Sequence, residues 1–231
     1  MSWREFWNNE TSLYANERHR LVHDEAVARD VAALVESPQD VVLDYGCGPA
    51  SSASLVALAC AHLYLYDPAP TLRQALQARF AGSEKITVLE AEGIEGTADS
   101  SLDLIVINSV LQYVPQPEFE ALLDRARVKL KPNGRLVAAD ILPVGAGAGD
   151  DVAALLKFAA QGGFLIAALG SLVTTFFSDY RKLRSQVGLM RYSEEGMTAL
   201  FAAHGFRAVR APHNIGHNQS RMMFVARPVA R

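Results

Sequence analysis

Five short apolar segments, separated by helix-like segments or a polar loop, restrict the fold of this chain more than any other feature. The apolar segments, each suited to a buried strand, are 41–45, 63–67, 86–90, 102–109 and 135–142. Segments with the apolar periodicity of helices lie between them at 51–60, 70–80 and 116–134. Strands joined through helices pair in parallel by right-handed crossovers, and helices then cover both faces of the sheet. The sequence therefore predicts an α/β fold with a parallel sheet.

Further helices and strands are predicted outside this alternation. Apolar residues at helical spacing in 17–35 predict an amphipathic helix that leads into the domain. A helix over 193–206 and strands at 206–212 and 221–228 follow near the end of the chain, which gives seven strands in all. We also expect serine caps at the start of 51–60, and Pro132 and Gly134 to end the helix that begins at 116.

Composition limits the classes of function and location. The 231 residues are 50% hydrophobic, so the chain can form a large core. The 22 basic and 25 acidic residues are intermixed, which gives no basic stripe and disfavours nucleic acid as a partner. Two cysteines make no disulfide framework and suit a reducing compartment. The N-terminal residues lack the apolar region of a signal peptide, so we expect a cytoplasmic protein.

An apolar insertion interrupts the alternation after Pro143. It starts with the glycine-rich segment "VGAGAGDD" (144–151), and 158–178 carries no charge over a length that could span a bilayer. Because strand-like sequence of the same sheet lies on both sides of it, we expect a helical lid or packed layer and no transmembrane span. A layer of core and a homodimer contact are the alternatives to a lid. The basic stretch at 179–184 leaves open a peripheral membrane contact, although a solvated face is the simpler interpretation.

Two glycines, Gly46 and Gly48, follow the first predicted strand directly before a helix. Glycine there permits unusual dihedral angles and leaves no Cβ to block a ligand, although a plain tight turn is the alternative. The dinucleotide fingerprint needs a third glycine where this chain has Ser51. Asp67 ends the second strand, where a carboxylate can bind the hydroxyls of a ribose. The pattern favours a nucleoside ligand without a pyrophosphate.

Four segments together resemble the successive motifs of class I S-adenosylmethionine-dependent methyltransferases of the small-molecule type. They are "VVLDYGCGPA", "LYLYDPAP", "SSLDLIVINSVLQYV" and "LKPNGRLVAAD", in the family's order and spacing over about residues 35–142. The resemblance implies a Rossmann-like, seven-stranded, mostly parallel sheet with helices on both faces, a C-terminal antiparallel strand and a helical lid. Tyr45 and Cys47 in the glycine loop depart from the pattern, as does "EAEGI" (90–94), where the family often has aspartate.

The resemblance also implies a set of cofactor contacts. Asp44, Gly46 and Gly48 would surround the methionine part of S-adenosylmethionine, and Asp67 and Pro68 the ribose and adenine. Further expected contacts are Glu92, Gly93 and Ile94 at the adenine edge and Asn108 and Ser109 near the sulfonium. In many small-molecule members an N-terminal segment folds over the cofactor. We therefore expect Tyr14 and Arg18 in such a cover, with Arg18 at the methionine carboxylate and a surface helix start as the alternative.

Methyl transfer needs a general base only if the attacking atom still carries a proton. His213 and His217, in the turn between the last two strands, suit proton transfer at neutral pH, and a polar hairpin loop is the alternative. Asp140, at the end of the fifth strand, is a third candidate. No cluster of ligands suggests a metal site.

These features divide the chain into four predicted parts. They are an N-terminal helical cap (1–36), a cofactor-binding core (37–143), an apolar helical lid (144–191) and the C-terminal part of the sheet (192–231). We expect a methyltransferase that transfers a methyl group from S-adenosylmethionine to O, N or C of a small, largely apolar acceptor, with S-adenosylhomocysteine as product. Cyclisation or lyase chemistry on the cofactor, and a cofactor-binding module without turnover, are the alternatives.

Overall fold

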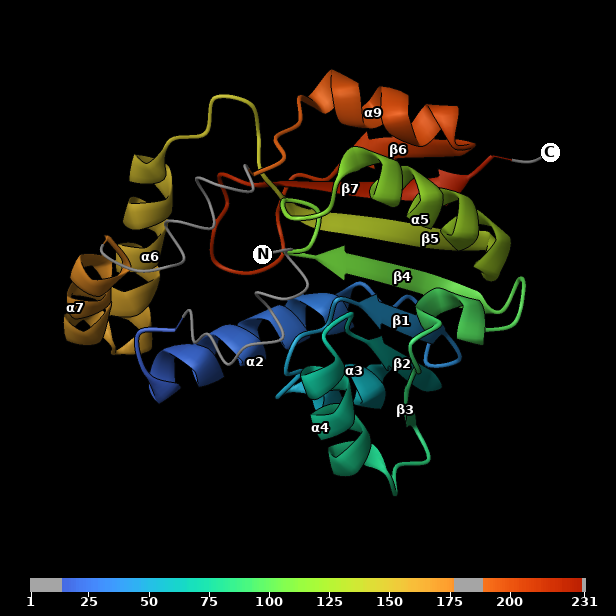
Figure 1. Cartoon of the computed structure of the whole chain (residues 1–231), viewed down its shortest axis with the longest axis horizontal. Coiled ribbons are helices and arrows are strands. Elements are labelled where there is room, and N and C mark those ends of the chain that lie inside the picture. The colour runs from blue at the N-terminus through green and yellow to red at the C-terminus, as the bar shows by residue number, and fades with distance from the viewer. Residues whose placement is uncertain (1–13, 177–188, 230–231) are drawn as a thin grey trace.

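A single seven-stranded sheet forms the centre of the computed structural model, which describes residues 14–176 and 189–229 (Figure 1). Its strand order is β3-β2-β1-β4-β5-β7-β6. The strands are β1 (Val41–Tyr45), β2 (His62–Tyr66), β3 (Ile86–Val88), β4 (Leu102–Asn108), β5 (Leu130–Ile141), β6 (Phe206–Arg210) and β7 (Met222–Pro228). Strand β7 is antiparallel to β5 and β6, and β1 to β5 pair in parallel. The predicted fold class is confirmed.

Helices cover both faces of this sheet. One face packs against α2 (Glu17–Ala33), α3 (Ala53–Ala59) and α4 (Pro70–Phe80), and the other against α5 (Gln116–Lys129) and α9 (Glu194–Ala203). Successive strand residues point to opposite faces of the sheet. The fully buried Val42 therefore lies in the core beneath α2, α3 and α4, and the fully buried Leu43 lies in the core beneath α5 and α9. A short 3₁₀ helix, η1 (Gly93–Gly96), lies between β3 and β4.

Two expected helix ends differ from the structure. Helix α5 ends at Lys129, and β5 begins at Leu130, which pairs with Leu102 of β4. A Cβ on Gly134 would lie 2.8 Å from the Leu102 carbonyl oxygen, so this segment already runs along the sheet. Helix α3 begins at Ala53, and the side chain of Ser52 makes no capping hydrogen bond. Ser193, by contrast, caps α9 by accepting a hydrogen bond from Gly196 N.

The apolar insertion forms two helices, α6 (Ala148–Gly162) and α7 (Leu165–Phe176). They are separated at Gly163, whose φ of 74° is the left-handed conformation in which helices commonly end. Among the described residues, no helix has the length and apolar character needed to cross a membrane. Figure 1 shows α6 and α7 beyond the ends toward which β4 and β5 point, beside α2. The basic stretch 179–184 lies outside the described residues.

Candidate active site

A cavity of about 1060 Å³ opens at the carboxyl ends of the central strands. Strand β1 lies between β2 and β4, so the chain leaves β1 toward one edge of the sheet and later returns to its other side. In open parallel sheets ligands bind at this switch point of strand order. The cavity is lined by residues that follow β1, β2, β4 and β5, by one face of α2, and by the β6–β7 loop.

The glycine loop after β1 forms one wall of the cavity. Gly46 and Gly48 have φ values of 81° and 57°, in the region that favours glycine. Gly46 N donates a hydrogen bond to Tyr66 O at 2.7 Å, which fixes the loop against the end of β2. Gly48 N donates to Asp67 Oδ2 at 2.9 Å, and the other carboxylate oxygen of Asp67 accepts from Ala69 N at 2.8 Å. The two features singled out from the sequence therefore touch each other.

Asp44 lies at the bottom of the cavity and has no ion-pair partner among the described side chains. Burial raises the pKa of its carboxyl to about 7, and repulsion from Asp67 adds to the shift. An unpaired carboxylate that resists ionisation suits a cationic ligand group, because the cation would offset the cost of burying the charge.

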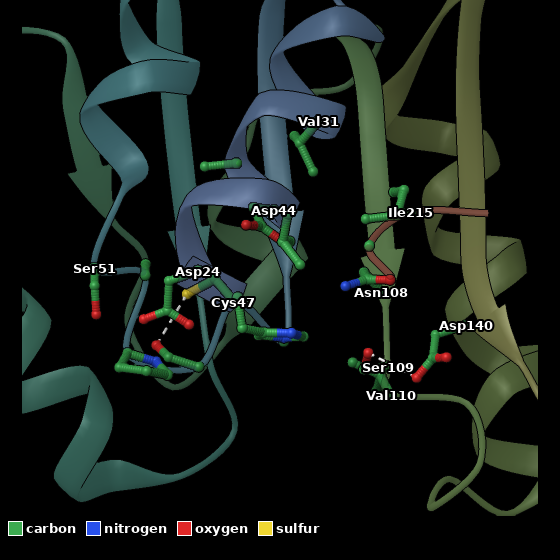
Figure 2. A pocket seen from close by; sticks show the side chains of 18 of the residues that line it. Asp24, Val31, Asp44, Cys47, Ser51, Asn108, Ser109, Val110, Asp140 and Ile215 are labelled. Atoms are coloured by element: carbon green, nitrogen blue, oxygen red, sulfur yellow. Dashed lines mark hydrogen bonds between the residues drawn. The ribbon is translucent and has the colours of Figure 1, made fainter. Parts of the chain in front are cut away.

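Residues at the ends of β4 and β5 form the opposite wall, where Figure 2 shows Asn108, Ser109 and Asp140. Ser109 Oγ donates to Asp140 Oδ2 at 2.8 Å. Both residues have left-handed backbones, with φ of 59° and 56°, and such strain in residues other than glycine is concentrated at functional sites. Burial raises the pKa of Asp140, while Arg221 and the Ser109 hydrogen bond oppose the shift. Asn108 Oδ1 is buried and has no hydrogen-bond partner among the described residues.

Helix α2 closes the cavity with a face that the sequence analysis did not single out. The cavity-lining positions of this helix are His19, Arg20, His23, Asp24, Val27, Ala28 and Val31. Most are three or four residues apart, which is the spacing of one helix face, so periodicity could have identified them. Arg20 donates to Ser51 Oγ of the glycine loop at 2.5 Å, which connects this face to the loop. It also pairs with Asp24 and, through Nε and Nη2, with Glu17 on the same helix.

The two residues expected in the N-terminal cover have different positions. Tyr14 lines the cavity and donates to Asp24 Oδ1 at 3.2 Å. Arg18 is exposed, does not line the cavity, and donates from Nε to Gly162 O at 2.6 Å, at the corner between α6 and α7. It lies two residues from Arg20, about 200° around the helix, so the two arginines cannot share a face.

The expected adenine-edge residues Glu92, Gly93 and Ile94 do not line the cavity. Glu92 is exposed, Ile94 is buried in the core, and a Cβ on Gly93 would lie 2.9 Å from the Tyr66 ring. Gly93 therefore packs closely against Tyr66. Beside Asp67 and Pro68 the wall is instead formed by Thr71 and Leu72 at the start of α4, which nothing in the sequence had distinguished from ordinary helix residues.

The two candidate histidines are also separated. His213 is exposed and lies outside the cavity, whereas His217 lines it. The His217 ring stacks on Phe158 of α6, with centroids 4.4 Å apart, and lies 5.8 Å from the His23 ring. Burial and the neighbouring histidines lower the pKa of His217 to about 4. At neutral pH His217 is therefore an uncharged imidazole.

The lid reaches the cavity through only part of its apolar surface. Asp151 and Leu155 of α6 line the cavity. Phe158 and Phe164 pack against imidazole rings instead, with Phe164 stacked 4.5 Å from His19. On α7, Ile166 is 89% exposed, so the apolar composition of the lid does not by itself describe the cavity wall. Within the described ranges no group of three or more potential ligands is placed to hold a metal ion.

Comparison with known proteins agrees with this geometry. A methyltransferase domain family matches residues 43–138, which include the glycine loop, Asp67 and the end of β4. This match covers the segment whose motifs resemble those of class I S-adenosylmethionine-dependent methyltransferases. The carboxy-S-adenosyl-L-methionine synthase of Dichelobacter nodosus is 34% identical over 115 residues, which are 48% of each chain.

Solved structures show the same methyltransferase fold. The mitomycin 7-O-methyltransferase MmcR superposes with a TM-score of 0.63 at 18% identity over 99% of this chain and 61% of that one. The magnesium protoporphyrin IX methyltransferase of Synechocystis PCC 6803, with bound S-adenosylhomocysteine, gives 0.55 at 17% identity over 98% and 92%. The matched stretches span about half the length of the curated relatives. The comparisons therefore establish the domain and its fold, while reaction and acceptor must be argued from the site.

Proposed function

We propose that this chain binds S-adenosylmethionine and transfers its methyl group to a small acceptor molecule. The observation that carries the proposal is the contact between the glycine loop and Asp67 above the unpaired Asp44, at the switch point of the sheet. A ribose needs a carboxylate near its hydroxyls, and a methionine ammonium needs an anion nearby. The chain has both on adjacent strands.

The residues present fit this cofactor. Gly48 has no heavy atom within 4 Å of the position that a Cβ would occupy, so the loop leaves room for a ligand. Asp67 and Pro68 would hold the ribose and adenine, together with Thr71 and Leu72. Asp44 would hold the ammonium, and Arg20 the carboxylate. When bound, the cofactor supplies an electrophilic methyl group on a cationic sulfur.

The chain's contribution to the reaction is alignment, exclusion of water and, for a protonated acceptor, removal of a proton. Asp140 lines the cavity beside Ser109 and is the base that the geometry favours. His217 is the second candidate, since it lines the same cavity as an uncharged imidazole. His213 does not line the cavity and so receives no role in proton transfer.

The size and walls of the cavity support a small acceptor. A single ligand pocket has a volume of roughly 300–1,000 Å³, so about 1060 Å³ leaves space for a nucleoside cofactor and a second small molecule. The apolar side chains that line the cavity include Val27, Val110, Leu155, Leu189 and Ile215. We propose an acceptor with a largely apolar body.

The second candidate function is a reaction that modifies or cleaves the cofactor itself, and one comparison favours it. A sequence relative is named as a synthase of carboxy-S-adenosyl-L-methionine, so related chains include one whose name records a modified cofactor as product. Product analysis separates the two functions. Methyl transfer gives S-adenosylhomocysteine and a methylated acceptor, whereas modification or cleavage of the cofactor gives other nucleosides. Unchanged cofactor with every acceptor would favour a binding module.

The proposed ribose contact gives a direct test of cofactor binding. We expect Asp67→Asn to weaken S-adenosylhomocysteine binding about 10- to 100-fold, because one hydrogen bond to a charged group is worth roughly 1.5–3 kcal/mol. Isothermal titration calorimetry measures the dissociation constants. Asp103→Asn, at the start of β4 and outside the cavity, is the matched control. A wild-type chain that binds NAD and ignores S-adenosylhomocysteine would rule out the proposed function.

The two arginines of α2 give a second, paired prediction. We expect Arg20→Met to weaken binding of S-adenosylhomocysteine about tenfold, since one charge-assisted contact is lost. Arg18→Met removes the hydrogen bond to Gly162 O and should leave that affinity unchanged. Calorimetry on both variants checks the assignment. The reverse pattern, with only Arg18→Met impaired, would restore Arg18 as the residue that binds the methionine carboxylate.

A further inference from the structure

Arg221 is a buried cation in the cavity wall whose hydrogen-bonding capacity is largely unused. It is 9% exposed and lies directly before β7. Its Nη2 donates to Asp151 Oδ1 of the lid at 2.7 Å. Its Nε and Nη1 are buried and find no partner among the described residues. Buried donors without partners are costly and uncommon in native proteins, and at functional sites they commonly serve a ligand.

Arg221 and the candidate base Asp140 are held close together by the sheet. Ile141 of β5 pairs with Met222 of β7, and each of the two charged residues immediately precedes one member of this pair. Both side chains line the cavity, and the charge of Arg221 lowers the pKa of Asp140, which is consistent with this proximity. The register between β5 and β7 shifts between Ala138 and Ile141, and Asp140 N donates to Asn214 Oδ1 at 2.8 Å. Such a bulge re-aims a side chain next to a site.

The two side chains offer complementary chemistry at one end of the cavity. Asp140 Oδ2 accepts from Ser109, and its other carboxylate oxygen has no described hydrogen-bond donor. The carboxylate can therefore accept a hydrogen bond from a hydroxyl or amine. The unpaired N–H groups of Arg221 can donate to a carbonyl or carboxylate oxygen. The cavity wall also includes the apolar side chains of Leu155 and Ile215.

We propose that Arg221 and Asp140 form an acceptor subsite that recognises a hydroxyl or amine next to a carbonyl or carboxylate oxygen on an otherwise apolar molecule. The inference rests on the proposed function and specifies its acceptor class. Arg221 binds the carbonyl or carboxylate oxygen and so determines specificity, while Asp140 receives the proton. The attacking oxygen or nitrogen forms a bond to the methyl carbon, the methyl–sulfur bond breaks with its electron pair passing to sulfur, and the proton passes to the Asp140 carboxylate.

The simplest aromatic probe with this pair of groups is 2-hydroxybenzoate. It is titrated by calorimetry into protein saturated with S-adenosylhomocysteine, alongside benzoate and phenol, each of which lacks one of the two groups. We expect 2-hydroxybenzoate to bind the wild-type complex at least about tenfold more tightly than either, as one hydrogen bond to a charged group requires. Arg221→Lys and Arg221→Met should lose the preference over phenol and should weaken benzoate binding, with no change for phenol. Arg210→Lys, on the exposed surface of β6, is the matched control.

Each outcome separates the subsite from rival explanations. If the wild-type complex binds the three probes equally, or does not bind 2-hydroxybenzoate, the subsite is wrong and the methyltransferase function stands. Failure to bind S-adenosylhomocysteine, measured first in the same cell, would instead contradict the proposed function. Asp151→Ala removes the lid contact and leaves the guanidinium in place. It should keep the preference, and a loss equal to that of Arg221→Met would show that Arg221 acts only through the lid.

Discussion

Asp44→Asn is expected to abolish most cofactor affinity while making the unliganded protein more stable at alkaline pH. The lost charge pair with the ligand ammonium should weaken binding roughly 10- to 100-fold, which corresponds to about 1.5–3 kcal/mol. The gain in stability follows from the raised pKa of the Asp44 carboxyl, about 7 against an ordinary value of 3.8. A residue that lowers stability in order to bind a ligand is characteristic of a functional site.

The pH dependence of this effect has a defined sign. Between pH 3.8 and about 7 the folded state holds a proton on Asp44 that the unfolded chain has released. Ionisation of Asp44 therefore destabilises the folded state fully above pH 7, and the penalty disappears as the pH falls toward 4. A shift of about three pKa units corresponds to at most about 4 kcal/mol. Asp44→Asn should increase the free energy of unfolding at pH 8 and change it little at pH 4.

Urea unfolding at the two pH values, with calorimetry for S-adenosylhomocysteine, measures both halves of this prediction. Asp99→Asn is the matched control, because the 69% exposed Asp99 pairs with Lys129 away from the cavity. It should change neither affinity nor the pH profile of stability. Equal stability of Asp44→Asn and wild type at pH 8 would contradict the assigned burial of the charge, whatever happens to binding.

Gly46→Ala is expected to be the most destabilising single change in the glycine loop. A Cβ at Gly46 would lie 2.3 Å from Cγ2 of Val110, a buried side chain at the end of β4, and φ is 81°. Overpacking costs about 1–3 kcal/mol, and a left-handed alanine adds about 1–2 kcal/mol. We expect the free energy of unfolding to fall by roughly 2–5 kcal/mol.

Two other glycines serve as controls. Gly48 has a φ of 57°, and no heavy atom lies within 4 Å of the position that a Cβ would occupy. Gly48→Ala should therefore lower the free energy of unfolding only by the backbone strain, about 1–2 kcal/mol. Gly82→Ala has neither strain nor contact and should be close to wild type. The double variant Gly46→Ala/Val110→Ala should be less destabilised than the sum of its two single variants, because Val110→Ala removes the clashing methyl group. Additive losses in urea unfolding would show that the clash is not the cause.

The local pattern of the sequence was sufficient for much of this molecule. The alternation of apolar and helical segments predicted the five parallel strands and the helices between them, since burial on both faces forces parallel strands to be continuously apolar. The last two strands were predicted from their own apolar segments outside this alternation. Helix α4 matches its predicted range of 70–80. Gly46, Gly48 and Asp67 were found because the ends of adjacent parallel strands meet at one edge. The hydrogen bond from Gly48 N to Asp67 confirms that the loop and the acid are neighbours. It does not identify the ligand that they bind.

Other site residues depended on packing that no single segment encodes. Arg18 and Arg20 have the same chemistry, and only the rotation of α2 against the sheet places Arg20 at the glycine loop and Arg18 at the lid. Arg221 belongs to the site because β7 returns antiparallel beside β5 and brings it next to Asp140. The sequence by itself determined the sheet, the glycine loop and the acid beside it, because these follow from local periodicity and strand order. The tertiary structure alone decided which side chains of α2, the lid and the last loop enter the cavity, because that depends on contacts between segments far apart in the chain.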